Sequence, residues 1–169
     1  FLENGGSLNL SGIPLWPGQN DYYTNFESGD SEFTGSGDWQ LAEIYSGPGG
    51  AYSGNLAWST NPEGNYTSGL NTHSLETNVF SLHNMAVPAL EIYHWYDIEN
   101  GYDGANVKIS DEYGQVWQIL HPSPDYPVEN LTDEFNNPLA GEPVYSGNSG
   151  GWKKIAFNLS GFKLSLIHI

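Results

Sequence analysis

Short runs of alternating apolar and polar residues recur along the chain, separated by Gly, Asn, Asp, Ser and Pro. The clearest run is 89–98, whose two faces are Leu90, Ile92, His94 and Tyr96 against Glu91, Tyr93, Trp95 and Asp97. Further runs of this kind are 38–45, 55–60, 106–110, 116–120 and 152–160. No window carries a sustained i, i+3, i+4, i+7 apolar stripe, so helices are not expected. The pattern predicts about eight short strands in an all-β fold, an antiparallel jelly roll or β-sandwich.

Two stretches depart from simple alternation. In 73–82, Leu75 and Val79 share one side whereas Phe80 and Leu82 switch faces, which favours one strand with a bulge. The stretch 121–151 is rich in Pro, Asn and Gly and has no strand pattern. Loops of this length are usually functional or cover a ligand.

Charge narrows the classes of partner. The 169 residues contain 20 acidic residues against 4 Lys plus Arg, a net charge of -16. Nucleic acid is excluded as a partner because phosphate contacts need Lys and Arg, and an anionic membrane surface is disfavoured for the same reason. No apolar run is long enough for membrane insertion. So acidic a chain repels itself unless cations bind, and calcium is the natural candidate because carboxylates and carbonyls are its ligands.

The length indicates one domain, and both ends look foreign to it. Residues 1–20, which include the Pro-flanked turn IPLWPG, are interpreted as the end of a preceding domain or a linker. Residues 21–163 are assigned to the domain. The final LSLIHI, residues 164–169, matches one reading-frame translation of a sequencing-library adapter. The alternative is that these six residues are an ordinary apolar strand.

The loop YDIENGYDG, residues 96–104, is the strongest candidate for chemistry. Asp97, Glu99 and Asp103 repel one another unless they are spread apart or bridged by a cation. Three interpretations stay open: a structural turn, a cation or ligand contact, and a glycosidase pair made of Glu99 and Asp103. The pair is disfavoured because both residues lie in one loop, whereas such carboxylates usually face each other across a cleft.

A second acidic stretch, 26–39, contains Glu27, Asp30, Glu32 and Asp38. Solvated loop acids and a calcium site are both compatible with it, and its spacing does not match an EF-hand. The candidate metal ligands are therefore Glu27, Asp30, Asp97, Glu99 and Asp103.

Three other motifs favour structural roles. Ser110, Gly114 and Trp117 have the spacing of an Asp-box hairpin, with Glu112 in the place of its Asp. His94, between two aromatics, is expected to be a hydrogen-bonded core or interface residue. Ser149 lies between glycines but precedes a predicted strand, so it does not form a nucleophile elbow. The chain has no cysteine, which excludes disulfides and thiolate chemistry.

From Asn25 to Phe162 the chain resembles the MAM-like jelly-roll domains attached to immune-inhibitor-A-type metallopeptidases and other secreted bacterial proteins. The matching stretches are 26–39, 51–66, 92–110, the hairpin ending in Trp117, and 145–162. The resemblance implies a non-catalytic, often cation-bound β-sandwich beside a catalytic domain of the same secreted chain. Family members continue with a closing strand, which this resemblance predicts to be missing here.

The leading functional hypothesis is an accessory binding module, not an enzyme, that docks its parent protein on polysaccharide or on a protein surface. Aromatic side chains would supply the contacts. The candidates are Trp58, Tyr66, Tyr93, Trp95 and Tyr126. The alternatives are a structural spacer with no ligand beyond a cation and, less favoured, a glycoside hydrolase.

Overall fold

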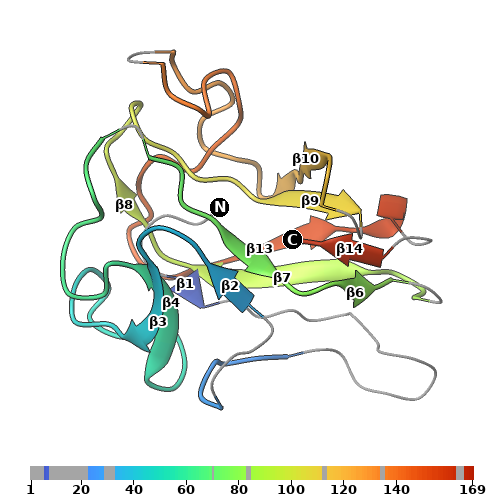
Figure 1. Ribbon diagram of the computed structural model, residues 1–169, viewed down its shortest axis with the longest axis horizontal. Helices are drawn as coiled ribbons and strands as arrows, with labels where there is room; N and C mark the ends of the chain where they lie inside the picture. Colours follow the sequence, from blue (N-terminus) through green and yellow to red (C-terminus); the bar gives the residue numbers. More distant parts are fainter. Residues whose placement is uncertain are drawn as a thin grey trace.

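Strands β7 (Ala89–His94) and β13 (Lys153–Asn158) pair antiparallel along their whole length, from Lys153 opposite His94 to Asn158 opposite Ala89. They are the centre of the larger sheet in this computed structural model, shown in Figure 1. The structure describes residues 6–7, 23–28, 33–69, 71–82, 85–111, 114–133, 136–162 and 166–169.

Two main sheets and two ribbons contain the strands of the described residues. The larger sheet has the order β11 (Pro122–Ser123), β13, β7, β1 (Gly6–Ser7), β4 (Leu56–Thr60) and β3 (Trp39–Glu43). The smaller sheet has the order β10 (Trp117–Ile119), β9 (Lys108–Asp111), β14 (Leu166–His168) and β6 (Phe80–Ser81). The ribbons pair β12 (Gly147–Asn148) with β8 (Asp97–Ile98), and β2 (Phe33–Gly35) with β5 (Leu75–Thr77).

One apolar core joins the two main sheets. Ile92 and Phe157 of the larger sheet are buried in the same cluster as Phe80, Ile109 and Ile167 of the smaller sheet. Every paired strand is antiparallel, so the predicted all-β sandwich is confirmed. Within the described residues, the helical element is the 3-10 turn η1 (Ser160–Phe162), and no helix there has the length and apolar character needed to cross a bilayer.

Strand β7 has the predicted alternation. Leu90, Ile92 and His94 are buried, while Glu91 and Tyr93 are half-buried on the opposite face. The run 73–82 differs from the prediction, because it forms β5 and β6 in different sheets instead of one bulged strand. Thr77 pairs with Phe33 of β2, whereas Phe80 pairs with Ile167 of β14, so the chain changes sheets at 78–79.

The two chain ends take part in the sheets. Gly6 pairs with Trp58 of β4 and with His94 of β7, so β1 lies inside the larger sheet, within the stretch 1–20 that the sequence assigns to the end of a preceding domain or a linker. Strand β14 lies between β9 and β6 and comes from the segment that we interpreted as a foreign tail. Ile167 of this strand is only 1% exposed and pairs with Asp111 of β9 and Phe80 of β6, so β14 is a buried, paired part of the smaller sheet.

Candidate functional site

Two adjoining cavities are lined by five of the ten candidate residues, Tyr66, Trp95, Asp97, Glu99 and Asp103. The acidic groove has a volume of about 840 Å³ and is lined by Asn65, Tyr66, Ser68, Gly69, Asp97, Ile98, Glu99, Tyr102, Asp103 and Asn137. The smaller Trp95 recess, of about 160 Å³, is lined by Ser46, Gly47, Pro48, Ser59, Thr60, Asn61, Gly64, Asn65, Tyr66, Trp95 and Asp97. Because Asn65, Tyr66 and Asp97 line both, the two cavities are neighbours.

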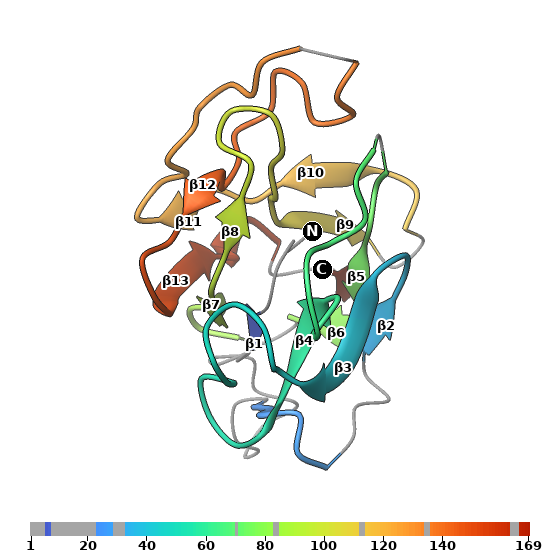
Figure 2. The same ribbon diagram turned by 90° about the vertical axis from the view of Figure 1, so that its left-hand side faces the viewer.

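The loop 96–104 forms one wall of the groove and is held in a fixed shape. The amides of Tyr102 and Asp103 both donate to the carbonyl of Glu99, which closes a turn in which Gly101 has a φ of 80°. From the distant chain, Ser146 Oγ accepts from Gly101 N at 2.9 Å and Thr132 Oγ1 donates to Gly101 O at 2.9 Å. Figures 1 and 2 show this loop and the long connection after β11 at the same end of the molecule.

Tyr66 joins this loop to the opposite wall. Its hydroxyl donates to Asp103 Oδ2 at 2.6 Å and accepts from the amide of Glu99 at 3.4 Å. The Asp103 carboxylate is therefore oriented by Tyr66, while the Glu99 side chain is exposed at the groove. The hydrogen bonds show a fixed turn, and Asp97, Glu99 and Asp103 of this loop line the groove.

Trp95 lies on the outward face, directly after β7, and is half-buried. The loop that contains Gly47 packs on its ring: a Cβ added at Gly47, whose φ is 78°, would lie 2.8 Å from the ring carbons. A side chain at this position would therefore displace Trp95. The glycine permits the close approach that shapes the recess.

The candidate metal ligands do not form one cluster. Asp97, Glu99 and Asp103 line the acidic groove, but among the described residues no three His, Asp or Glu side chains converge closely enough to hold a metal ion. Glu27 instead accepts from the amides of Asn55 and Leu56, each at 2.7 Å, and these hydrogen bonds lower its pKa. Asp30 lies outside the described residues.

Two of the candidate aromatics are core residues, which corrects the expectation that they bind a ligand. Trp58 in β4 is 8% exposed, because both faces of that strand are covered. Tyr126 is 6% exposed. Its hydroxyl donates to Leu120 O at 2.9 Å and accepts from Val107 N at 3.0 Å, and burial raises its pKa. Neither ring can offer a face to a partner.

Sequence reasoning missed four residues that lie at or near the site. Tyr102 and Asn137 line the acidic groove. Tyr52 stacks on Tyr93 with ring centroids 3.7 Å apart, and Trp152 meets Tyr52 edge-on at 6.1 Å. Tyr52 lies in a Gly- and Ser-rich loop without periodicity, so the sequence offered no signal beyond its being aromatic.

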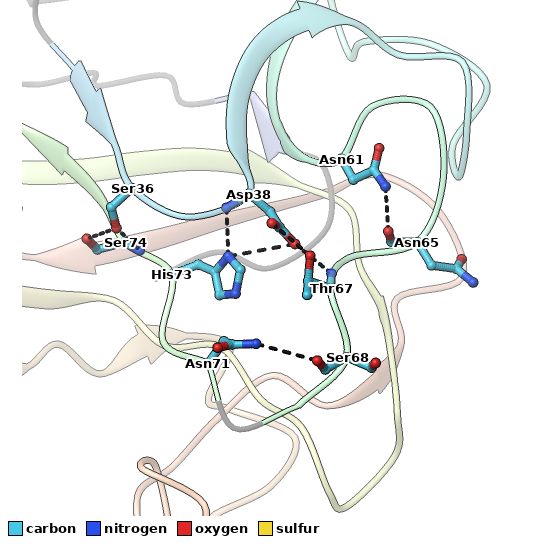
Figure 3. A network of polar contacts seen from close by, with 9 residues as sticks. All are labelled: Ser36, Asp38, Asn61, Asn65, Thr67, Ser68, Asn71, His73 and Ser74. Atoms are coloured by element: carbon cyan, nitrogen blue, oxygen red, sulfur yellow. Dashed lines mark hydrogen bonds and ion pairs between the residues drawn. The ribbon is translucent and has the colours of Figure 1, made fainter.

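A polar network beside the groove holds the loop that contains Asn65 and Tyr66 (Figure 3). Thr67 donates from its amide and its hydroxyl to the Asp38 carboxylate, at 2.6 and 3.0 Å. The amide of Asp38 donates to His73 Nδ1 at 2.7 Å. Partial burial raises the pKa of Asp38, but the bonds from Thr67 and the nearby His73 outweigh this and lower it below its usual value.

This network contains Ser, His and Asp side chains but does not have the geometry of a hydrolytic triad. Nδ1 of His73 accepts a hydrogen bond from the backbone amide of Asp38, so in a neutral His73 it carries no proton to donate to the Asp38 carboxylate, which is 3.8 Å away. The hydroxyls of Ser36 and Ser74 bond to each other at 2.8 Å. We infer that Asp38 positions the loop.

Comparisons with known proteins give no relative. No protein-family model, no curated protein and no solved structure matches the chain.

Proposed function

We propose that this chain is a MAM-like, non-catalytic binding module of a secreted bacterial multidomain protein, and that it docks a catalytic domain of the same parent on polysaccharide. One observation carries the proposal. Trp95 and the acids of the 96–104 loop that follows it, together with Tyr66 from a distant part of the chain, line two adjoining cavities. Aromatic faces beside hydrogen-bonding side chains are the usual composition of a small-ligand or sugar site.

The test is retention of the purified chain on insoluble polysaccharides, with soluble glycans as competitors. Trp95→Ala and Tyr66→Phe should weaken retention, since the first removes a ring of the recess and the second removes the hydroxyl that orients Asp103. Tyr45→Ala is the matched control, because Tyr45 is 71% exposed and lines neither cavity. Retention on immobilised proteins instead of glycans would favour a protein surface as the partner, and no retention on either would favour the spacer.

A glycoside hydrolase is the second candidate, because Glu99 and Asp103 line the same groove. A hydrolase should release reducing sugar from a bound glycan, and Glu99→Gln should abolish this release while binding persists. Binding without release by the unchanged chain would leave the docking module as the function.

Calcium belongs to the same proposal as a stabilising ion. If Asp97, Glu99 and Asp103 move together around Ca²⁺, the melting temperature should rise by several degrees with calcium and return with EDTA, since a ligand of the native state stabilises it by mass action. Asp97→Asn should remove the shift and Glu129→Gln, an exposed acid outside the groove, should keep it. An unchanged melting temperature would contradict a calcium site.

A further inference from the structure

The outward face of β7 continues the two cavities as a line of aromatic rings. Tyr93 lies on the face of β7 opposite the buried His94, and Trp95 follows directly after the strand, on the side away from His94 and Tyr96, whose rings pack on each other. One loop covers both: Gly47 packs on Trp95, and Tyr52 stacks on Tyr93 at an interplanar angle of 15°. Tyr52 is 45% exposed, so part of this residue remains accessible to a ligand although it stacks on Tyr93.

We call the pair Tyr52 and Tyr93, with Trp152 at its edge, the aromatic ledge. The loop 47–52 joins the ledge to the Trp95 recess, because it packs on both Trp95 and Tyr93, and the recess adjoins the acidic groove that Tyr66 and Tyr102 line. Exposed aromatic rings suit pyranose units, because each sugar presents an apolar face that packs on an aromatic ring. The ledge, the recess and the groove are therefore one track, which is longer than a single sugar.

The charge of the track selects among glycans. Three carboxylates, Asp97, Glu99 and Asp103, line the cavities, and no lysine is among the described lining residues. Lys154 beside the ledge is paired with Glu91 at 2.8 Å, and its Nζ lies 6.0 Å from the Tyr93 ring centroid, so the ledge itself is close to neutral. An anionic glycan would meet like charges in a chain whose net charge is already -16.

Ammonium groups fit this track in two ways. Carboxylates accept charge-assisted hydrogen bonds from them, and aromatic faces attract cations. We propose that the track binds an extended amino-sugar polymer with free ammonium groups, the rings of its sugars stacked on the aromatic side chains and its ammonium groups at Asp97 and Glu99. This inference rests on the proposed docking function and names the polysaccharide class for the same site.

The experiment is calorimetric titration of the full chain with glucosamine oligomers, from dimer to hexamer, beside N-acetylglucosamine hexamer and cellohexaose. The glucosamine hexamer should bind roughly tenfold tighter than either uncharged hexamer, and its advantage should fall at high ionic strength. Affinity should rise from dimer to hexamer as the oligomer extends from the groove to the ledge.

Two variants separate the parts of the track. Asp97→Asn with Glu99→Gln should remove the preference for glucosamine but leave weak binding of cellohexaose, while Glu129→Gln changes nothing. Tyr52→Ala should weaken the hexamer and leave the dimer unaffected, and Tyr45→Ala should weaken neither. A Tyr52 variant that loses dimer and hexamer equally would overturn the extended track.

Each remaining outcome has a distinct meaning. Equal affinity for the three hexamers would overturn the amino-sugar inference and leave polysaccharide docking in place. If polylysine binds as tightly as the glucosamine hexamer, affinity depends on positive charge alone, and the amino-sugar inference is also overturned. If no glycan binds at any length, both this inference and the proposed function fail.

Discussion

At the scale of single residues, His94 makes folding sensitive to pH. His94 is 2% exposed, and its ring meets the ring of Tyr145 edge-on, with the ring centroids 4.4 Å apart. Lys153 of β13 lies opposite His94 in the strand pairing. Burial, with a smaller effect from Lys153, lowers the pKa of His94 to about 4 from the usual 6.5. The imidazole is therefore neutral in the folded protein at pH values where the unfolded chain would protonate it.

The sign of the effect follows from this difference. Between about pH 6.5 and pH 4 the unfolded chain binds more protons than the folded one, so stability falls as the pH falls. From pH 7 to pH 5 the loss should be about 2 kcal/mol. Urea unfolding at both pH values measures it. His94→Phe should flatten the dependence, whereas His121→Gln, at an exposed position, should keep it. An equally steep dependence in His94→Phe would contradict the assignment.

At the scale of elements, Asp38 links the β2–β3 turn to the loop 61–74. The contact needs close backbone approach, since a Cβ at Gly37 would lie 2.4 Å from His73 Nδ1, and Gly37 has a φ of 64°. Only a carboxylate at position 38 can accept both bonds from Thr67.

Asp38→Asn should therefore cost about 1–2 kcal/mol, and should loosen the loop that contains Asn65 and Tyr66. Chemical denaturation measures the first effect, and hydrogen exchange of the Thr67 amide measures the second. The same change at Asp125, an exposed acid in another loop, is the control. Faster exchange at Thr67 in both variants would mean that the Asp38 contact is not what holds the loop.

The elements also show where sequence reasoning stops. Alternation predicted β7 and its buried face, because a strand buried on one side must alternate. It failed at 78–79, because the change of sheet depends on distant partners: Phe33 for Thr77, and Ile167 for Phe80. The long stretch 121–151 is fixed by similar distant contacts, such as the bond from Asn106 Nδ2 to Glu142 Oε2 at 2.8 Å.

For the candidate site, residue chemistry predicted Asp97, Glu99, Asp103, Tyr66 and Trp95, and the structure places them around two adjoining cavities. Aromatic character alone could not separate these rings from Trp58 and Tyr126, which are buried. Exposure depends on which sheet face each ring meets, and that is decided by pairing between strands. The same reasoning explains why Tyr52, in a loop, was missed.

At the scale of the whole molecule, the smaller sheet depends on the last residues of the chain. Ile167 and Ile169 are buried. Ile169 makes two hydrogen bonds with Thr77 of β5: its backbone oxygen accepts from Thr77 N at 2.8 Å, and its amide donates to the Thr77 side-chain Oγ1 at 3.1 Å. Strand β14 lies between β9 and β6 and pairs with both, so its removal leaves β6 without a partner in the smaller sheet and exposes one edge of β9.

Deleting residues 164–169 should therefore remove about 3–6 kcal/mol of apolar burial from the two isoleucines alone, a large part of the stability of an ordinary domain. We expect a strongly lowered melting temperature or loss of cooperative unfolding, measured by calorimetry.

Because the deletion could abolish folding altogether, Ile167→Ala serves as the graded variant, with an expected loss of about 2–5 kcal/mol in the free energy of unfolding. Val116→Ala, at a position 64% exposed, should be neutral. If the deleted and full-length chains melt alike, residues 164–169 are not part of the folded domain and the foreign-tail interpretation stands; if the deletion unfolds the sandwich, the six residues act as its closing strand whatever their source.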